Sequence, residues 1–422
     1  MEAYIAARLA LKEIIVNDVL FSTALKKALM EEPLPPEGES FMRAAVSCEL
    51  HHHLLLSRLV TDSGLAFSAD DRFLVLLVLA NHIFLKRRPN TESLDFLVQE
   101  ICIPGAAVDE TSLRGFFAPL GDATTVMPKN LAPDSDVYLS LKFNTPEWLI
   151  RMWKKHYGLP VTLKILSANT RPVIPACRVN TLEITRDEIL KDPDFVAGPI
   201  EDTVIYRGQG PLKKKSQYLE CKVFQQRFGI THIIDSLHFE PRQSVLIYEE
   251  RPNAVYIEIA VCGHNEVLLN VAANSMERRL DIRKAARDYN IQNIEVFESS
   301  PTLLITHVSQ PVDAVIYIAD CSKFDLIRSL PDFFIHFRQS NLDNLIAKQN
   351  AGIEECAKLV APGGRLCYAV NTINNKESHQ LIADFLTRHP DYTLENERQY
   401  LPFDQFNMAL YFAVLRKAVP AV

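Results

Sequence analysis

The stretch from Val360 to Ile373 constrains the fold of this chain more than any other. Apolar positions three and four residues apart predict a helix over 342–360. Pro362-Gly363-Gly364 is expected to end that helix, because glycine adopts positive φ at no steric cost. Arg365 to Val370 is short and largely apolar, which predicts a strand. A helix, a turn and a strand in this order are typical of an α/β sheet.

The same alternation of strand and helix extends over residues 229–420. Strand-like segments are expected at 244–248, 267–273, 294–297, 314–318, 365–370 and 410–415. Helical stretches lie between them, notably Met276 to Asp288. Because strands separated by helical lengths form parallel sheets with helices on both faces, this region predicts a doubly wound, Rossmann-like domain.

Residues 1–130 show no such alternation and predict an all-helical bundle of roughly four to six helices. The longest apolar run, Phe73 to Leu85, contains Asn81 and His82 and is too short to cross a bilayer. We therefore expect a buried helix there and no membrane association. Polar, proline-containing residues 127–136 predict a linker after the bundle.

A small α+β module is expected over 139–228, which makes the chain a multidomain α and α/β protein. Thr145 is expected to cap a helix that starts at Pro146. The segment from Cys177 to Leu182 is predicted to begin with a strand, and Lys213-Lys214-Lys215 lies in a predicted loop.

Length and composition agree with several soluble domains. The chain has 422 residues, of which 48% are hydrophobic and 23% charged. A net charge of −7 argues against a generally basic nucleic-acid coat but permits a local basic face. Eight cysteines without CxxC spacing favour reduced thiols in a cytoplasmic protein, and the first residues lack a signal-peptide pattern.

The order of these three regions resembles the RsmB/Nop (Sun) family of S-adenosylmethionine-dependent RNA cytosine-5 methyltransferases. The matching motifs are Pro146–Leu149, Asn169–Pro172, Arg178–Leu182, Asp313–Pro331 and Leu359–Phe385. The resemblance implies a NusB-like helical domain at 1–130 and an RNA-binding wing at 139–228. It also implies a Rossmann-like methyltransferase domain at 229–420.

The resemblance places two catalytic positions in this sequence. In the family, the strand at 365–370 is followed by Thr-Cys, whose thiolate attacks cytosine, but this chain has Val370-Asn371. An amide side chain is not a nucleophile. A second family cysteine, which is thought to help resolve the covalent RNA adduct, corresponds to Cys321. Asp320 beside it is expected to raise the pKa of that thiol.

The resemblance implies S-adenosylmethionine as cofactor, but its site is degenerate in this sequence. The family loop VLDxCAAPGGKT aligns with Val245 to Tyr256, which keeps Pro252 and neither glycine. Cβ atoms then occupy the space of the methionine part, and Glu249 and Glu250 would repel its carboxylate. The ribose-binding acid corresponds to Asn274, or to Asn270 in a shifted register, and asparagine is a weaker acceptor. These losses weigh against cofactor binding.

Five residues match positions that face RNA or lie in basic segments: Arg171, Arg178, Asn180, Lys214 and Arg328. The resemblance makes structured RNA, in particular rRNA, the expected partner. The alternatives are that Asn180 caps a turn, that Arg178 pairs with a carboxylate, and that the lysine loop is merely solvated. The run Cys48 to His53 predicts a partly exposed helix surface and no metal site, because adjacent helical histidines point about 100° apart.

Three functions remain open. The favoured one is a catalytically degenerate homologue, a pseudoenzyme that binds structured rRNA, because the losses fall at several separate sites. The second is an active rRNA cytosine-5 methyltransferase with a rearranged site that uses Cys321. The third is a protein-interaction or transcription-related factor that binds a protein partner through the helical domain.

Overall fold

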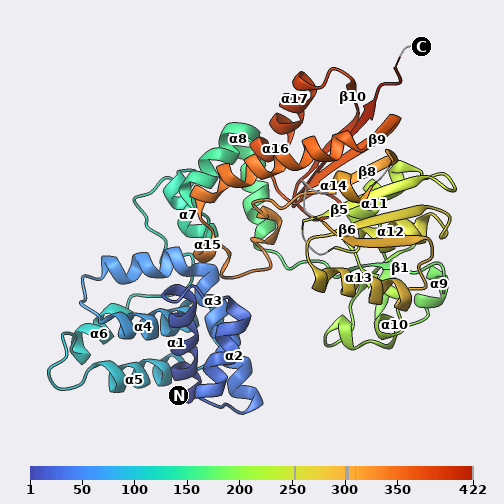
Figure 1. The fold of residues 1–422 in the computed structure, drawn as a ribbon. Helices are drawn as coiled ribbons and strands as arrows, with labels where there is room; N and C mark the ends of the chain where they lie inside the picture. The colour runs from blue at the N-terminus through green and yellow to red at the C-terminus, as the bar shows by residue number, and fades with distance from the viewer. Residues whose placement is uncertain (251–252, 300–303, 309, 421–422) are drawn as a thin grey trace. The chain divides into compact units, whose positions relative to one another are not determined.

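The computed structural model describes residues 1–250, 253–299, 304–308 and 310–420 (Figure 1). Its internal contacts divide the chain into two compact units. Unit 1 is Met1–Arg171 with Leu326–Phe337, and unit 2 is Pro172–Asp325 with Arg338–Val422. The boundary predicted near residue 229 falls inside unit 2, so the three predicted domain ranges stay predictions.

Unit 1 is helical, and six of its α-helices precede residue 130, as predicted. Its longer elements are α1 (Glu2–Ile15), α2 (Phe21–Glu31), α3 (Pro36–Asp62), α4 (Ala69–Ala80), the π-helical turn η1 (Asn81–Leu85), α5 (Asn90–Ile101), α6 (Glu110–Phe117), α7 (Asp136–Phe143) and α8 (Glu147–Asn169). The short helix α15 (Phe333–His336) belongs to the segment that joins this unit from later in the chain.

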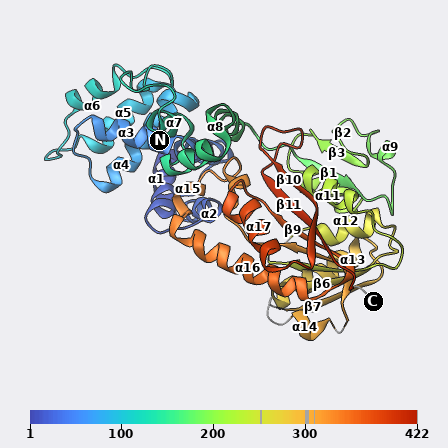
Figure 2. The same ribbon diagram turned by 90° about the horizontal axis from the view of Figure 1, so that it is seen from above.

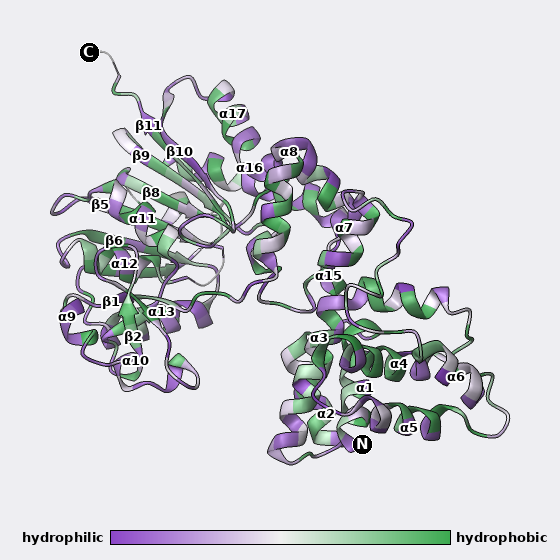
Figure 3. Cartoon of the chain, turned by 180° about the vertical axis from the view of Figure 1, so that it is seen from behind, coloured by the Kyte–Doolittle hydropathy of each residue, from purple (hydrophilic) through white to green (hydrophobic). Residues whose placement is uncertain are grey.

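The centre of unit 1 is α4. Every residue from Phe73 to Ala80 is buried, and this part of the helix is hydrophobic (Figure 3). Ser68 caps its first turn, since its hydroxyl accepts a hydrogen bond from the Asp71 amide at 3.1 Å. The predicted buried helix is therefore confirmed.

The predicted cap of α8 is wrong. Pro146 is the N-cap residue and makes no side-chain cap, while the Thr145 hydroxyl donates to the Phe143 carbonyl at 3.0 Å. Gly158 interrupts the same helix with a φ of 77°, a conformation that glycine adopts without strain.

Unit 2 contains a four-stranded antiparallel sheet in the order β2-β3-β1-β4, which confirms the α+β module. Its strands are β1 (Ala176–Val179), β2 (Phe195–Ala197), β3 (Thr203–Tyr206) and β4 (Val223–Gln225), accompanied by the single-turn helices α9 (Arg186–Ile189) and α10 (Ser216–Leu219). The core of the sheet includes Cys177, Val179 and Phe195.

The second sheet of unit 2 has seven strands in the order β10-β11-β9-β8-β5-β6-β7. They are β5 (Ser244–Glu249), β6 (Leu268–Ala273), β7 (Ile294–Glu298), β8 (Val312–Ile318), β9 (Val360–Val370), β10 (Tyr392–Tyr400) and β11 (Leu410–Lys417). Strands β5 to β9 are parallel, and β10 and β11 are antiparallel. This mixed sheet confirms the Rossmann-like prediction and adds β10, which was not predicted.

Helices cover both faces of this sheet (Figures 1 and 2). One layer contains α11 (Phe228–Leu237), α12 (Val255–Cys262) and α13 (Met276–Asp288), and the other contains α16 (Leu342–Lys358) and α17 (His379–Arg388). Alternate strand residues face the two layers: Val245 packs in the first core and Leu246 in the second.

The Pro-Gly-Gly motif does not end a helix. Helix α16 already ends at Lys358, and β9 starts at Val360, so the motif lies within the strand. The pairing with β8 shifts register there, from Val312 opposite Val360 to Ala314 opposite Arg365. Gly363 has a φ of 74°, so the motif provides an irregularity in the strand rather than a helix stop.

No helix among the described residues is long and apolar enough to cross a membrane.

Candidate functional site

The carboxyl ends of β5, β6, β8 and β9 meet at one edge of the seven-stranded sheet. Glu249 pairs in register with Ala273 and Ile318, and Ile318 pairs with Ala369. Residues that directly follow these strands therefore lie side by side, and this edge is where open α/β sheets bind ligands. We call the part around Cys321, Asn371 and Glu377 the β8–β9 edge, and the part around Glu250 and Asn274 the β5–β6 edge.

At the β8–β9 edge the structure brings the two predicted catalytic positions together. Asn371 directly follows β9, and its backbone amide is hydrogen-bonded to the Cys321 thiol. Burial raises the pKa of Cys321 well above its ordinary value, and the nearby Glu377 and Asp325 act in the same direction. The acid predicted to act on this thiol was Asp320. That prediction is corrected, because burial is the main cause and other acids contribute.

A neutral thiol in this position is a poor nucleophile. Cys367, the other cysteine near the site in sequence, lies inside β9, and burial raises its pKa to about 12. Asn371 carries an enclosed Oδ1 that accepts no hydrogen bond from the described residues. The described residues of this edge therefore hold no activated cysteine.

A buried hydrogen-bond network surrounds these positions and is centred on Glu377, which is fully buried. Its carboxylate accepts hydrogen bonds from the Ser322 amide at 2.8 Å, the Ser322 hydroxyl at 2.5 Å, Gln349 at 3.0 Å and Asn374 at 2.8 Å. Ser322 also bonds to the Thr372 hydroxyl at 2.6 Å. The network ties the loop after β8 to the loop after β9.

The sequence did not single out Glu377, Gln349 or Ser322. Gln349 is on α16, and Ser322 and Glu377 follow two different strands, so their contact depends on the tertiary fold. The only local signal was the resemblance of the segment Leu359–Phe385 to the family, which covers Glu377 without assigning it a role.

At the β5–β6 edge, Asn274 follows β6 directly and is exposed, whereas Asn270 lies within the strand. The structure therefore assigns Asn274 to the strand end. Its side-chain amide donates to the Glu250 carbonyl at 2.9 Å, and the Glu250 carboxylate accepts from the Asp320 amide at 2.6 Å. Pro252, the other predicted cofactor residue, lies outside the described residues.

The described residues here do not fit S-adenosylmethionine well. Burial raises the pKa of Glu250, and its side chain is anchored on the loop after β8, so a carboxyl group lies directly after β5, where the family resemblance implies the cofactor loop. The Nδ2 of Asn274 donates to the Glu250 carbonyl, and its Oδ1 is an uncharged acceptor, weaker than the carboxylate that the family resemblance implies there. Neither residue provides the close backbone approach that glycines give in nucleotide sites.

Arg178 is 4% exposed and is surrounded by acceptors within unit 2. Its Nε lies 3.2 Å from a Glu258 oxygen, and Nη1 donates to the Glu201 carbonyl at 2.7 Å. Burial raises the pKa of Glu258 to about 7, although Arg178 acts in the opposite direction. Burial prevails, and these contacts match the alternative in which Arg178 pairs with a carboxylate.

Asn180 is fully buried and also matches its alternative. Its Oδ1 accepts from the Leu182 amide at 3.3 Å and its Nδ2 donates to the Cys221 carbonyl at 3.1 Å, so it closes a turn. Arg328, in unit 1, is 9% exposed. In this structure, none of these three side chains is exposed enough to contact a phosphate.

Arg171 and Lys214 are exposed. Lys214 ends a short 3-10 turn, and its neighbour Lys215 instead pairs with Asp192 and Asp194. Of the five predicted RNA-binding residues, these two have the exposure that a phosphate contact requires, and their RNA contact stays a prediction.

The three adjacent histidines lie on α3 and have separate surroundings. His51 Nδ1 is 2.7 Å from the Ser47 carbonyl, His52 stacks on Phe84 and His53 pairs with Glu49. Within residues 1–250, 253–299, 304–308 and 310–420, no three His, Cys, Asp or Glu side chains are placed to hold a metal ion together.

Comparisons with protein families match two parts of the chain. Residues 259–412 match the family described as 16S rRNA methyltransferase RsmB/F, and residues 145–192 match the Methyltr_RsmF/B-like, ferredoxin-like domain.

Two curated relatives are named as ribosomal RNA small subunit methyltransferases. The probable ribosomal RNA small subunit methyltransferase B of Bacillus subtilis (strain 168) is 24% identical over 60% of this chain and 58% of its own length. The ribosomal RNA small subunit methyltransferase B of Xanthomonas campestris pv. campestris is 25% identical over 65% of this chain and 66% of its own length. The match thus spans less than two thirds of each of these relatives.

Solved structures share the fold. The crystal structure of PH0851 superposes with a TM-score of 0.74 at 17% identity and covers 98% of both chains. A methyltransferase homolog protein from Pyrococcus horikoshii has a TM-score of 0.59 at 18% identity and covers 68% of this chain and 100% of its own.

Proposed function

Because this chain belongs to the RsmB/F family of S-adenosylmethionine-dependent RNA cytosine-5 methyltransferases, we propose that it binds structured rRNA without transferring a methyl group. One observation carries the proposal. At the β8–β9 edge, Asn371 stands where the family resemblance places the attacking cysteine, and the neighbouring Cys321 is a buried, neutral thiol.

The cofactor region supports the same proposal. A carboxyl group and an uncharged amide lie at the β5–β6 edge, where the family resemblance implies glycines and a ribose-binding acid. Loss of the nucleophile alone could reflect a shifted alignment. Changes at a second strand end of the same sheet argue against that explanation.

Titration calorimetry of the full chain with S-adenosylmethionine tests the cofactor part. We expect no saturable heat at ligand concentrations up to the millimolar range. Tight, saturable binding that disappears in Asn274→Arg would overturn this part, because the arginine would fill the strand end without disturbing the core.

RNA binding is tested separately, by fluorescence anisotropy with a labelled hairpin from small-subunit rRNA. We expect an affinity that falls as salt increases and that Lys214→Glu weakens. Lys26→Glu, at an exposed lysine of α2, is the charge-matched control. An unchanged affinity in high salt would contradict a phosphate-dependent interaction.

An active methyltransferase is the second candidate, and similarity to relatives named as methyltransferases favours it. Cys321 would then have to act as the nucleophile. RNA containing 5-fluorocytosine traps such an attack as a covalent adduct. An adduct that forms with the unmodified chain and S-adenosylmethionine, and is lost in Cys321→Ser, would establish this second function.

A further inference from the structure

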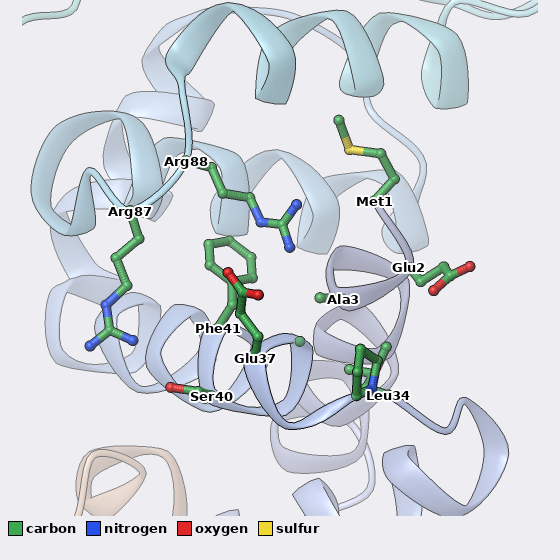
Figure 4. A pocket seen from close by; sticks show the side chains of 11 residues that line it. Met1, Glu2, Ala3, Leu34, Glu37, Ser40, Phe41, Arg87 and Arg88 are labelled. Atoms are coloured by element: carbon green, nitrogen blue, oxygen red, sulfur yellow. The ribbon is translucent and has the colours of Figure 1, made fainter.

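A pocket of about 520 Å³ lies in unit 1 (Figure 4). It is lined by the start of α1, the segment that leads into α3, and Arg87 and Arg88 after the π-helical turn. Nothing in the proposed function involves it. Its chemistry is set by two adjacent arginines and two glutamates, Glu2 and Glu37.

Arg88 is the half-buried charge of this pocket. Its guanidinium lies over the Phe41 ring, 4.3 Å from the ring centroid, and 6.0 Å from the centroid of Tyr4 (Figure 4). Across the described parts of the chain, neither Arg87 nor Arg88 forms an ion pair with a carboxylate. The stacked guanidinium therefore keeps its hydrogen-bond donors available while its orientation is fixed.

Asn81 fixes the backbone that carries both arginines. This side chain is fully buried, its Oδ1 accepts from the amides of Arg87 and Arg88 at 3.2 Å each, and its Nδ2 donates to the Arg88 carbonyl at 3.1 Å. The Asn81 amide both donates to and accepts from the Arg87–Arg88 backbone. Because this backbone is fixed in advance, less entropy is lost when the two arginine side chains bind a ligand.

Neither glutamate forms an ion pair with Arg87 or Arg88 in the described parts of the chain. Glu2 and Glu37 are exposed; the Glu2 carboxylate points away from Arg88, whereas the Glu37 carboxylate is turned toward it (Figure 4). Solvated carboxylates cost little when they stay unpaired, whereas a half-buried guanidinium gains most from an anionic partner. The first turn of α3 has no side-chain cap and opens on the same pocket, but Glu37 and Glu39 in that turn offset the positive end of the helix, so the arginines provide the positive charge of the pocket.

We propose that the Arg87–Arg88 pocket binds a phosphate group, with Arg88 as a planar fork; Arg87, whose side chain extends in a different direction (Figure 4), adds positive charge at the rim of the pocket. The phosphate can come from the RNA backbone or from a free nucleotide. The RNA source rests on the proposed function, whereas the phosphate contact itself does not.

The first experiment measures binding of the labelled rRNA hairpin to full-length variants by anisotropy at low salt. We expect Arg87→Ala to weaken binding about tenfold and to reduce the salt slope by about 1. Arg88→Lys keeps the charge and the cation–π contact but removes the fork, so it should weaken binding about fivefold without affecting folding. Glu37→Gln should tighten binding about twofold, because it removes a nearby negative charge.

Arg58→Ala is the matched control, since Arg58 is exposed near the other end of α3 and pairs with Asp62. It should leave binding unchanged. Equal affinity for the unmodified chain, Arg87→Ala and Arg88→Lys would overturn the pocket while leaving the proposed RNA function intact. So would weaker binding in Glu37→Gln.

The second experiment separates the sources. Thermal unfolding is followed in sodium phosphate and in sodium chloride at equal ionic strength, and uridine monophosphate is titrated by calorimetry. A phosphate-dependent rise in Tm that the Arg87→Ala/Arg88→Lys double variant lacks supports the pocket even if no RNA binds, in which case only the proposed function fails. Saturable nucleotide binding that needs Arg88 assigns the site to free nucleotides. The phosphate-binding proposal is overturned if phosphate does not raise Tm, the nucleotide does not bind and the double variant binds RNA as the unmodified chain does.

Discussion

At the β8–β9 edge, four donors converge on the buried carboxylate of Glu377, whereas at the β5–β6 edge the exposed Asn274 and the partly buried Glu250 share a few hydrogen bonds. Both edges belong to one sheet, and the family resemblance implies site positions at each. The first edge couples two loops of the fold, and the second carries the positions that the resemblance assigns to the cofactor. Under the proposed function, residues needed for packing persist where residues needed only for chemistry have changed.

Disrupting the hydrogen-bond network at the β8–β9 edge should cause the largest loss of folding stability. In Glu377→Gln the new amide group would face donors from Ser322 and Asn374, so we expect a loss of about 3 kcal/mol in the free energy of unfolding. Urea unfolding measures it. Glu354→Gln is the control, because Glu354 pairs with Arg388 and His389 near the surface, and a change of under about 1 kcal/mol is expected there. Equal effects in the two variants would remove the distinction between the edges.

The contrast explains which parts of the sequence were informative. Strands such as β8, predicted at 314–318, could be recognised because their apolar residues are contiguous, and Asn371 could be proposed as a replacement of the nucleophile because it lies in a locally recognisable stretch. The edge strand β10 was missed because exposed polar residues at its centre, such as Glu395, give no core-facing pattern.

Long-range contacts could not be predicted from the sequence. The environment of Arg178 depends on Glu258, eighty residues away along the chain, and Glu377 meets Ser322 only when two strands lie side by side. A local pattern identifies an arginine as basic, but it cannot show that the fold encloses the side chain.

The β5–β6 edge should respond to pH rather than to loss of a network. Burial raises the pKa of Glu250, so the folded chain binds this proton more tightly than the unfolded chain. Stability from this group is complete below its ordinary pKa and is lost as pH rises through the raised value. Glu250→Gln keeps an acceptor for the Asp320 amide, so relative to the unmodified chain it should gain under about 1 kcal/mol between pH 4 and pH 8. Chemical unfolding at the two pH values measures this gain, and a variant that instead loses stability at pH 8 would contradict the assignment.

The smallest change in stability is expected from Asn371→Cys, which restores the family nucleophile. Asn371 Oδ1 accepts no hydrogen bond from the described residues, so replacing the amide with a thiol should alter the free energy of unfolding by under about 1 kcal/mol. We expect this variant to show no methyl transfer from tritiated S-adenosylmethionine to small-subunit rRNA, because under the proposed function the β5–β6 edge binds no cofactor. Cys321→Ser/Asn371→Cys is the matched control for background labelling. Transfer by Asn371→Cys above that background would mean that the cofactor site is intact and that the chemistry was lost at the nucleophile alone. The two edges would then differ by one residue rather than by a division between packing and chemistry.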